Sequence, residues 1–258
     1  QTLSAFGTVQ GSMSLLVDSY TDLARWKSVV DRLATFEQGL QHAEHLPRLE
    51  PEKSGETLQL QQVKVEQPNG FILMHEANWQ LKQGDSMLIQ GPSGCGKSTL
   101  LRTLAGLWPF ASGKVCYPAN SLPLFLSQKP YLPLGSLRQV LSYPLPEVPN
   151  TEAIEVLQAV GLDKLSARLD DTELWSQILS LGEQQRIAFA RILLVKPDVL
   201  FLDEATSALD EQSEAMLYRL LRTQLPQTIM VSVGHRSTLH PFHEKKLLWQ
   251  ENGQWQFA

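Results

Sequence analysis

The stretch Gly91-Pro-Ser-Gly-Cys-Gly-Lys-Ser-Thr99 decides how the rest of the chain is interpreted, because it fits the phosphate-binding pattern G-x-x-x-x-G-K-[ST]. The apolar residues 87–89 before it predict a strand, and the apolar run 100–104 after it predicts a helix. The motif requires this strand–loop–helix order. Glycines let backbone N–H groups turn inward around a phosphate chain at the positive end of the following helix. We therefore expect a phosphate-binding loop here and not a chance match in a glycine-rich turn.

The same stretch supplies two side chains for a bound nucleotide. Lys97 adds a positive charge for the outer phosphates, and the Ser98 hydroxyl is a ligand for Mg²⁺. We therefore expect a nucleotide and Mg²⁺ to bind here. The loop residues predicted to bind the nucleotide are Gly91, Pro92, Ser93, Gly94, Cys95, Gly96, Lys97, Ser98 and Thr99.

The composition is that of a globular protein and disfavours several classes of function. The 258 residues carry a formal net charge of −5 and show no basic stripe, so no nucleic-acid partner is expected. Two cysteines give no disulfide framework, which favours a reducing compartment. No apolar run reaches about 18 residues, so nothing in the sequence is expected to span a bilayer. Because the chain begins at Gln1 without an initiator methionine, we expect a fragment or a processed form.

Residues 1–46 are predicted to form an amphipathic helix and the start of a linker. Apolar side chains recur at intervals of three and four from Phe6 to Phe36, which marks one stripe on a helix. Such a helix would be about 60 Å long, too long for one that merely packs on its own small domain. The alternatives are a helix folded back on the domain and two helices broken near Gly11. Residues 47–57 are polar and carry two prolines, which predicts a linker.

Residues 58–258 are predicted to form an α/β domain. Alternating apolar and polar residues over 58–65, followed by a turn and a second strand over 71–74, predict an antiparallel hairpin. Residues 77–90 predict another strand pair, which ends at the phosphate-binding loop. Farther on, strand and helix patterns alternate, which predicts a parallel core. The other predicted elements are strands at 114–117, 124–127, 199–202 and 228–233, helices at 181–195 and 211–223, mainly helical structure over 134–175 with a helix capped by Thr151 and closed by Gly161, and a terminal β-pair ending near Phe257.

Two neighbouring acids follow the buried strand 199–202. A carboxylate at the carboxyl end of a parallel strand, beside a phosphate loop, is well placed to hold Mg²⁺, and we assign this role to Asp203. Glu204 would point to the other side of the strand and is the expected general base for an attacking water. The alternative, a helix cap with a neighbouring acid, is weaker because the phosphate loop lies upstream.

The loop and five later motifs occur in a fixed order that resembles the nucleotide-binding domain of an ABC transporter. The resemblance implies an ATPase with a P-loop NTPase core built on a parallel sheet. It also implies an antiparallel β subdomain and a small helical subdomain, preceded by the long N-terminal helix, and ATP with Mg²⁺ as cofactors. The later motifs are Ser127-Gln128, Leu179-Ser-Leu-Gly-Glu-Gln-Gln-Arg186, Phe201-Leu-Asp-Glu204, Ser207-Ala-Leu-Asp210, and His235 in Val231-Ser-Val-Gly-His-Arg236.

The resemblance also implies roles for residues outside the loop. Gln128 would be a metal ligand and a sensor of a membrane domain, and Asp210 would lie at a dimer seam. His235 would contact the γ-phosphate, with an ordinary strand-end histidine as the alternative. Ser180 and Gly182, where a helix begins, can donate hydrogen bonds to the γ-phosphate bound by the opposing subunit.

The sequence departs from the family pattern at two places. Leu181 and Glu183 stand where the family more often has glycine and glutamine, but the serine and glycine donors remain, so we expect a competent site in trans. Gln67 precedes the turn proline Pro68, where many members carry an aromatic residue that stacks on adenine, and Phe71 is the candidate replacement. We therefore expect looser discrimination of ATP from GTP.

The residues in these motifs most resemble those of the branch that contains the peroxisomal fatty-acyl-CoA transporters and bacterial relatives of the SbmA/BacA type. In that branch the membrane and nucleotide domains share one polypeptide, and residues 1–40 resemble the cytoplasmic extension of its last transmembrane helix. The resemblance implies a head-to-tail dimer with a second copy, a transmembrane domain upstream of residue 1, and a place at the cytoplasmic face of the bacterial inner membrane. The alternatives are a free-standing ATPase subunit that docks on a separate permease and a non-transport ABC ATPase.

Overall fold

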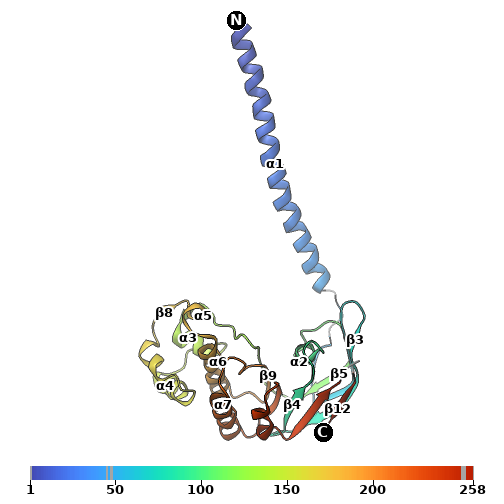
Figure 1. Ribbon diagram of the computed structural model, residues 1–258, viewed down its shortest axis with the longest axis vertical. Helices are drawn as coiled ribbons and strands as arrows, with labels where there is room; N and C mark the ends of the chain where they lie inside the picture. The colour runs from blue at the N-terminus through green and yellow to red at the C-terminus, as the bar shows by residue number, and fades with distance from the viewer. Residues whose placement is uncertain (1, 45, 47–48, 251–253, 258) are drawn as a thin grey trace. The chain divides into compact units, whose positions relative to one another are not determined.

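The computed structural model describes residues 2–44, 46, 49–250 and 254–257, without the side chains of 2–18, 42 and 44, and the chain divides into two compact units (Figure 1). The first unit, Gln1–Pro47, consists of helix α1 (Thr2–Glu44). This helix runs through Gly11, so the alternative of two helices broken there is wrong. Its 43 residues span about 65 Å. Within the described ranges, no helix is both long and apolar enough to cross a membrane.

The second unit, Arg48–Ala258, contains a six-stranded sheet in the order β12-β11-β4-β10-β9-β6. Neighbours from β11 to β6 are parallel and β12 is antiparallel to β11, which confirms the predicted parallel core and terminal β-pair. Because parallel strands end at one edge, the loops after β4, β9 and β10 meet there. The strands are β4 (Ser86–Gln90), β6 (Pro123–Leu126), β9 (Val199–Asp203), β10 (Ile229–Val233), β11 (Lys245–Trp249) and β12 (Trp255–Phe257).

A separate four-stranded sheet, in the order β1-β5-β2-β3, contains the predicted hairpin of β2 and β3. The predicted strand pair over 77–90 is wrong, because β3 continues past an irregularity at Glu76 and β4 belongs to the other sheet. A turn carries the chain between the sheets; in it the Lys82 N–H donates to the Asp85 carboxylate (2.8 Å) and Gly84 has φ +81°. The strands are β1 (Glu52–Lys53), β2 (Leu58–Glu66), β3 (Ile72–Leu81) and β5 (Ala111–Tyr117).

Residues 134–175 form a helical subdomain, as predicted, although several turns interrupt it. The predicted cap Thr151 is wrong: the helix starts at Asn150 and the capping residue is Pro149, two residues earlier, whose carbonyl accepts the Ala153 N–H (3.0 Å). Gly161 follows this helix at φ +73°, the left-handed conformation expected of a closing glycine. The elements are β7 (Gly135–Ser136), α3 (Leu137–Ser142), α4 (Asn150–Ala159), the 3₁₀ helix η1 (Asp163–Arg168), β8 (Thr172–Glu173) and α5 (Trp175–Ile178).

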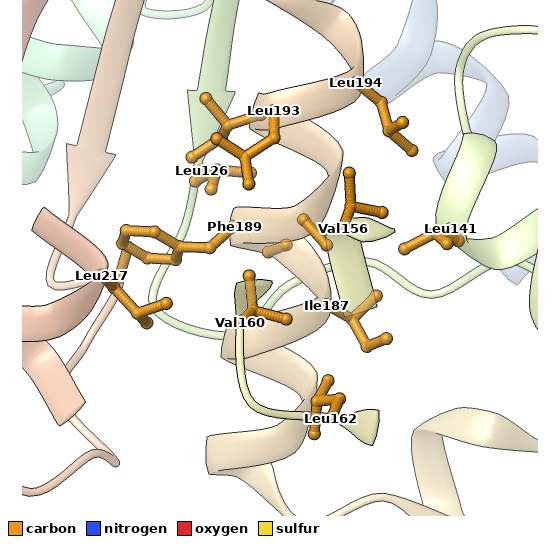
Figure 2. Packing of buried hydrophobic residues seen from close by; sticks show 14 of the residues in the cluster. Leu126, Leu141, Val156, Val160, Leu162, Ile187, Phe189, Leu193, Leu194 and Leu217 are labelled. Atoms are coloured by element: carbon orange, nitrogen blue, oxygen red, sulfur yellow. The ribbon is translucent and has the colours of Figure 1, made fainter. Parts of the chain in front are cut away.

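Each face of the six-stranded sheet has its own apolar core, because alternate residues of a strand point to opposite faces. Val199 and Phe201 of β9 pack with α2 and the antiparallel sheet, whereas the two leucines at 200 and 202 pack with α6 and α7. Figure 2 shows this second core, where Phe189 of α6 points toward Leu217 of α7. The remaining helices are α2 (Lys97–Leu104), α6 (Leu181–Val195), which ends where predicted, α7 (Glu211–Gln224) and the 3₁₀ helix η2 (Ser237–Phe242).

Candidate functional site

The phosphate-binding loop connects β4 to α2 at the carboxyl edge of the parallel strands (Figure 1). Gly94 and Gly96 have φ +78° and +113°, a region that residues with a Cβ disfavour. Gly91 is needed for another reason, since a Cβ there would lie 2.7 Å from the Cβ of Trp249. The loop therefore has the backbone that its glycines predict. Of its other residues, Pro92 and Ser93 are exposed, and Cys95, Ser98 and Thr99 are partly buried.

Two side chains of the loop make the contacts that define its interior. The Lys97 ammonium donates to the carbonyl oxygens of Gly91 (2.9 Å) and Pro92 (2.7 Å), so it lies across the loop. Both acceptors are neutral, and a phosphate oxygen is a stronger acceptor for an ammonium group. The Ser98 hydroxyl donates to Oδ1 of Asp203 (2.8 Å), which joins the loop to the end of β9.

Asp203 is the last residue of β9 and is only 8% exposed. Burial raises the pKa of its carboxyl group, although the hydrogen bond from Ser98 acts in the opposite direction. A buried carboxylate beside a hydroxyl is a pair of hard oxygen donors whose negative charge a divalent cation would compensate. The pair therefore fits Mg²⁺, the metal expected from the sequence.

Glu204 follows in an unusual backbone conformation, with φ +49°. A non-glycine residue held in this region stores about 1–3 kcal/mol of strain, which persists only where the surroundings enforce it. Here the Glu204 N–H donates to the Val233 carbonyl (3.1 Å), and its Oε1 lies 3.3 Å from Nε2 of His235. The structure thus brings Glu204, the expected base, into contact with His235, the histidine expected to contact the γ-phosphate, beyond the ends of β9 and β10.

Ser180 and Gly182 lie at the start of α6. The Ser180 hydroxyl accepts the Glu183 N–H (3.3 Å), and the Glu183 carboxylate accepts both the N–H (2.9 Å) and the hydroxyl (2.7 Å) of Ser180. This reciprocal capping box gives Glu183, the departure from the family pattern, a local function. Gly182 permits close packing, because a Cβ there would lie 3.2 Å from Cδ2 of Leu209.

Asp210 caps α7 by accepting the N–H (2.8 Å) and the hydroxyl (2.7 Å) of Ser213. These hydrogen bonds, that of the backbone N–H above all, lower the pKa of its carboxyl group. Together with Ser180 and Gly182, Asp210 lines a cavity of about 520 Å³, and no residue of the loop 91–99 lines it. The predicted site residues therefore fall into two groups at two places on the unit.

Gln128 is exposed, and among the described contacts its side chain makes no hydrogen bond to Ser98 or Asp203, so its role as a metal ligand stays a prediction. Its carbonyl accepts Nε2 of Gln185 (2.9 Å), a fully buried residue that the sequence reasoning missed. The available signal was that Gln185 lies one turn before Phe189 on the same face of the predicted helix, because an amide buried on an apolar face requires partners. Arg236, which contacts residues 207–209, was also missed.

The fold and this site define a P-loop nucleotide-binding protein. More specifically, the chain belongs to the ABC transporter family, whose model matches residues 74–207, and this is a family of ATPases. The branch expected from the sequence is confirmed, because the relatives include transporters of the D family.

Three relatives illustrate the similarity. The chain is 50% identical over 196 residues to an uncharacterized ABC transporter ATP-binding protein of Haemophilus influenzae, covering 75% of this chain and 33% of that protein. It is 38% identical over 233 residues to the inner membrane ABC transporter ATP-binding protein YddA of Escherichia coli (90% and 41%). It is 34% identical over 271 residues to the human lysosomal cobalamin transporter ABCD4 (99% and 44%). The chain thus spans less than half the length of these curated relatives.

Proposed function

We propose that the chain hydrolyses ATP as the nucleotide-binding domain of a half-size ABC transporter, and that two copies enclose two ATP molecules head to tail. The observation that supports this proposal is the division of the site into two groups. The loop 91–99 lies with Asp203, whereas Ser180, Gly182 and Asp210 line a different cavity. When two copies of such a chain pair head to tail, the first group of residues in one copy can meet the second group in the other copy.

In this proposal Lys97 and the amides of the loop hold the phosphates of ATP. Ser98 and Asp203, with Gln128 from the loop after β6, hold Mg²⁺. The metal, when bound, neutralises the charge on the β- and γ-phosphates. In the partner copy, Ser180 and Gly182 at the N-terminus of α6 donate hydrogen bonds to the γ-phosphate.

Glu204 acts as the general base that takes a proton from the attacking water. Its contact with His235, 3.3 Å from Oε1 to Nε2, holds the two side chains at one place. His235 is half exposed, so its ring can also reach a phosphate oxygen and stabilise the transferring phosphoryl group.

The transporter part of the proposal rests on α1 and on the relatives. Large apolar side chains of α1, among them Tyr20, Trp26 and Phe36, are exposed. Such a stripe is expected of a helix that continues from a transmembrane domain upstream of residue 1 and packs on that domain. YddA is described as an inner membrane protein, which supports a place at the cytoplasmic face of a bacterial inner membrane. A free-standing ATPase subunit, the alternative, would need another partner to cover these apolar side chains.

The test is a Glu204→Gln variant in the full transporter chain. Without the base, hydrolysis should fall by about two to four orders of magnitude while ATP still binds, so the ATP-bound dimer should accumulate. Analytical ultracentrifugation with Mg-ATP measures the dimer formed by the isolated chain, and phosphate release measures hydrolysis by the full transporter. Glu211→Gln, an exposed acid at the start of α7, is the matched control and should behave as wild type.

Two results would contradict the proposal. Hydrolysis by Glu204→Gln at a substantial fraction of the wild-type rate would remove Glu204 from the role of base. A monomer that hydrolyses ATP at the wild-type rate over a wide range of protein concentration would show that the ATP sites are not shared between two copies.

A further inference from the structure

The loop 206–210, between Glu204 and α7, is anchored on one side by Gln185 of α6. The Gln185 Nε2 donates to the Ser207 hydroxyl (3.2 Å), and its Oε1 accepts the Ala208 N–H (3.1 Å). The same Nε2 donates to the Gln128 carbonyl (2.9 Å). One buried amide therefore fixes one side of this loop against two other segments of the site.

The other side of the loop is held by Arg236. Its Nη1 donates to the Leu209 carbonyl (2.6 Å) and its Nη2 donates to the Ser207 carbonyl (3.2 Å). Arg236 directly follows His235, the residue in contact with Glu204. The planar guanidinium group of Arg236 thus connects the segment that contains His235 to the loop 206–210.

A buried carboxylate orients this arginine. Glu214, in the first turn of α7, is 2% exposed and lies 3.8 Å from Nη1 of Arg236. It accepts hydrogen bonds from the Thr206 hydroxyl (2.6 Å) of the loop 206–210 and from the Thr238 hydroxyl of η2. Two hydroxyl groups thus hold the Glu214 carboxylate in place, and its negative charge faces the guanidinium group and favours one position of Arg236.

The groups that hold Arg236 lie close to Glu204 and His235. Glu204, Thr206, Glu214, His235 and Arg236 line one small cavity of about 110 Å³. The loop 206–210 and the Glu204–His235 contact therefore adjoin the same small cavity. Through Gly182, whose missing Cβ accommodates Leu209, the same loop also packs against the start of α6.

We propose that Arg236 is a positioning residue for ATP hydrolysis: it ties the loop 206–210 to His235, so that the loop and the Glu204–His235 pair take up their reactive geometry together. The inference rests on the proposed function, because it assigns the coupling to hydrolysis at this site. Arg236 acts through the loop and touches neither ATP nor the attacking water.

The test compares steady-state ATP hydrolysis by the variants Arg236→Gln and Arg236→Lys with that by the matched control Arg219→Gln. All three are made in the full transporter chain. Arg219 is exposed on α7 and should give wild-type kinetics. Arg236→Gln should lower kcat about tenfold or more while KM for ATP changes less than about twofold, because the groups that hold ATP are untouched. Arg236→Lys keeps the charge facing Glu214 but loses the two-pronged donor, so it should recover only part of the rate.

A double-mutant cycle with Asp210→Asn separates positioning from a general effect on the fold. If Arg236 acts through the loop, its loss in the Asp210→Asn background should lower kcat less than its loss in the wild type does. Full additivity of the two losses would overturn the inference, as would a parallel fall in thermal midpoint and kcat for Arg236→Lys. If Arg236→Gln does not fold, the lysine variant carries the same cycle. A wild-type chain without ATPase activity would count against the proposed function, whereas an active wild type with an unaffected Arg236→Gln counts only against this inference.

Discussion

At the scale of single residues, Asp203 and Glu204 are neighbours in sequence but have different surroundings. Asp203 is buried at the end of β9 and bonded to Ser98, whereas Glu204 is a third exposed, has left-handed backbone and contacts His235. Two adjacent carboxylates can therefore take two roles, one toward a metal and one toward a proton, because environment sets what each group does. Both roles are predictions from the position of the acids at the end of a strand, whereas the contact between Glu204 and His235 is seen only in the fold.

The buried charge of Asp203 leads to a prediction about stability. Because its folded pKa is raised, ionisation of Asp203 destabilises the native state at a pH above the folded pKa; this destabilisation decreases as the pH falls through the folded pKa and is gone below the unfolded pKa. Asp203→Asn keeps the acceptor for Ser98 and removes the charge, so it should raise the thermal midpoint by about 1–3 °C and abolish ATPase activity. Differential scanning calorimetry without nucleotide and a phosphate-release assay measure the two effects. Glu155→Gln, on the exposed side of α4, should change neither, and a lower midpoint for Asp203→Asn would contradict the prediction.

The nucleobase gives the second prediction at this scale. Gln67 offers no ring for adenine, and Phe71, the aromatic candidate in the same turn, is 59% exposed. Without a fixed stacking partner the site should discriminate weakly between purines, so kcat/KM for GTP should lie within about 100-fold of that for ATP. Parallel assays with the two nucleotides measure this ratio. A GTPase rate below about one hundredth of the ATPase rate would show that adenine is recognised by other groups.

At the scale of elements, the sequence was most informative where apolar periodicity and end signals agreed. Helix α6 has the predicted bounds because Ser180 and Glu183 cap one end and the apolar side chains continue to the other. The strand pair over 77–90 was wrong because a short alternating run does not reveal which sheet it joins. Gln185 and Arg236 were missed for a related reason, since their partners are 22 to 57 and 22 to 29 residues away in the chain.

His243, between η2 and β11, gives a prediction about pH. Burial lowers the pKa of its ring from 6.5 to about 4; the hydrogen bond to the Leu239 carbonyl acts in the opposite direction, and the electrostatic effects of Arg222 and His240 add to that of burial. The neutral ring donates from Nδ1 to the Leu239 carbonyl (2.8 Å) and accepts at Nε2 from the Ser232 hydroxyl (2.8 Å). Between these pKa values the unfolded chain binds the proton and the native state does not.

The free energy of unfolding should therefore fall as the pH drops from about 6.5 to about 4, by about 3 kcal/mol in excess of a His243→Gln variant. Urea titrations of both proteins at several pH values measure the difference. His75→Gln serves as the control, because His75 is exposed on β3 and should leave the pH dependence as in the wild type. If the free energy of unfolding changed with pH equally in the wild type and in His243→Gln, the buried ring would not resist protonation.

At the scale of the whole unit Arg48–Ala258, one sheet separates two cores. Alternate residues of β9 belong to different cores, so neither core can lose its packing without disturbing the strand that ends at Asp203 and Glu204. The site is therefore expected to share the stability of both cores, although its residues come from loops.

The last prediction tests this shared stability with Phe189→Ala, which opens a cavity in the core of Figure 2. Phe189 is 1% exposed and packs edge-on against Tyr218, so its truncation should lower the free energy of unfolding by about 3–5 kcal/mol. Because the sheet couples the cores, hydrogen exchange in α6 and in β3 should accelerate by the same factor, with β3 lying in the opposite core. Phe71→Ala, at an exposed ring, should cost less than about 0.5 kcal/mol. Faster exchange confined to α6 would show instead that the helical side unfolds alone and leaves β3 and its core intact.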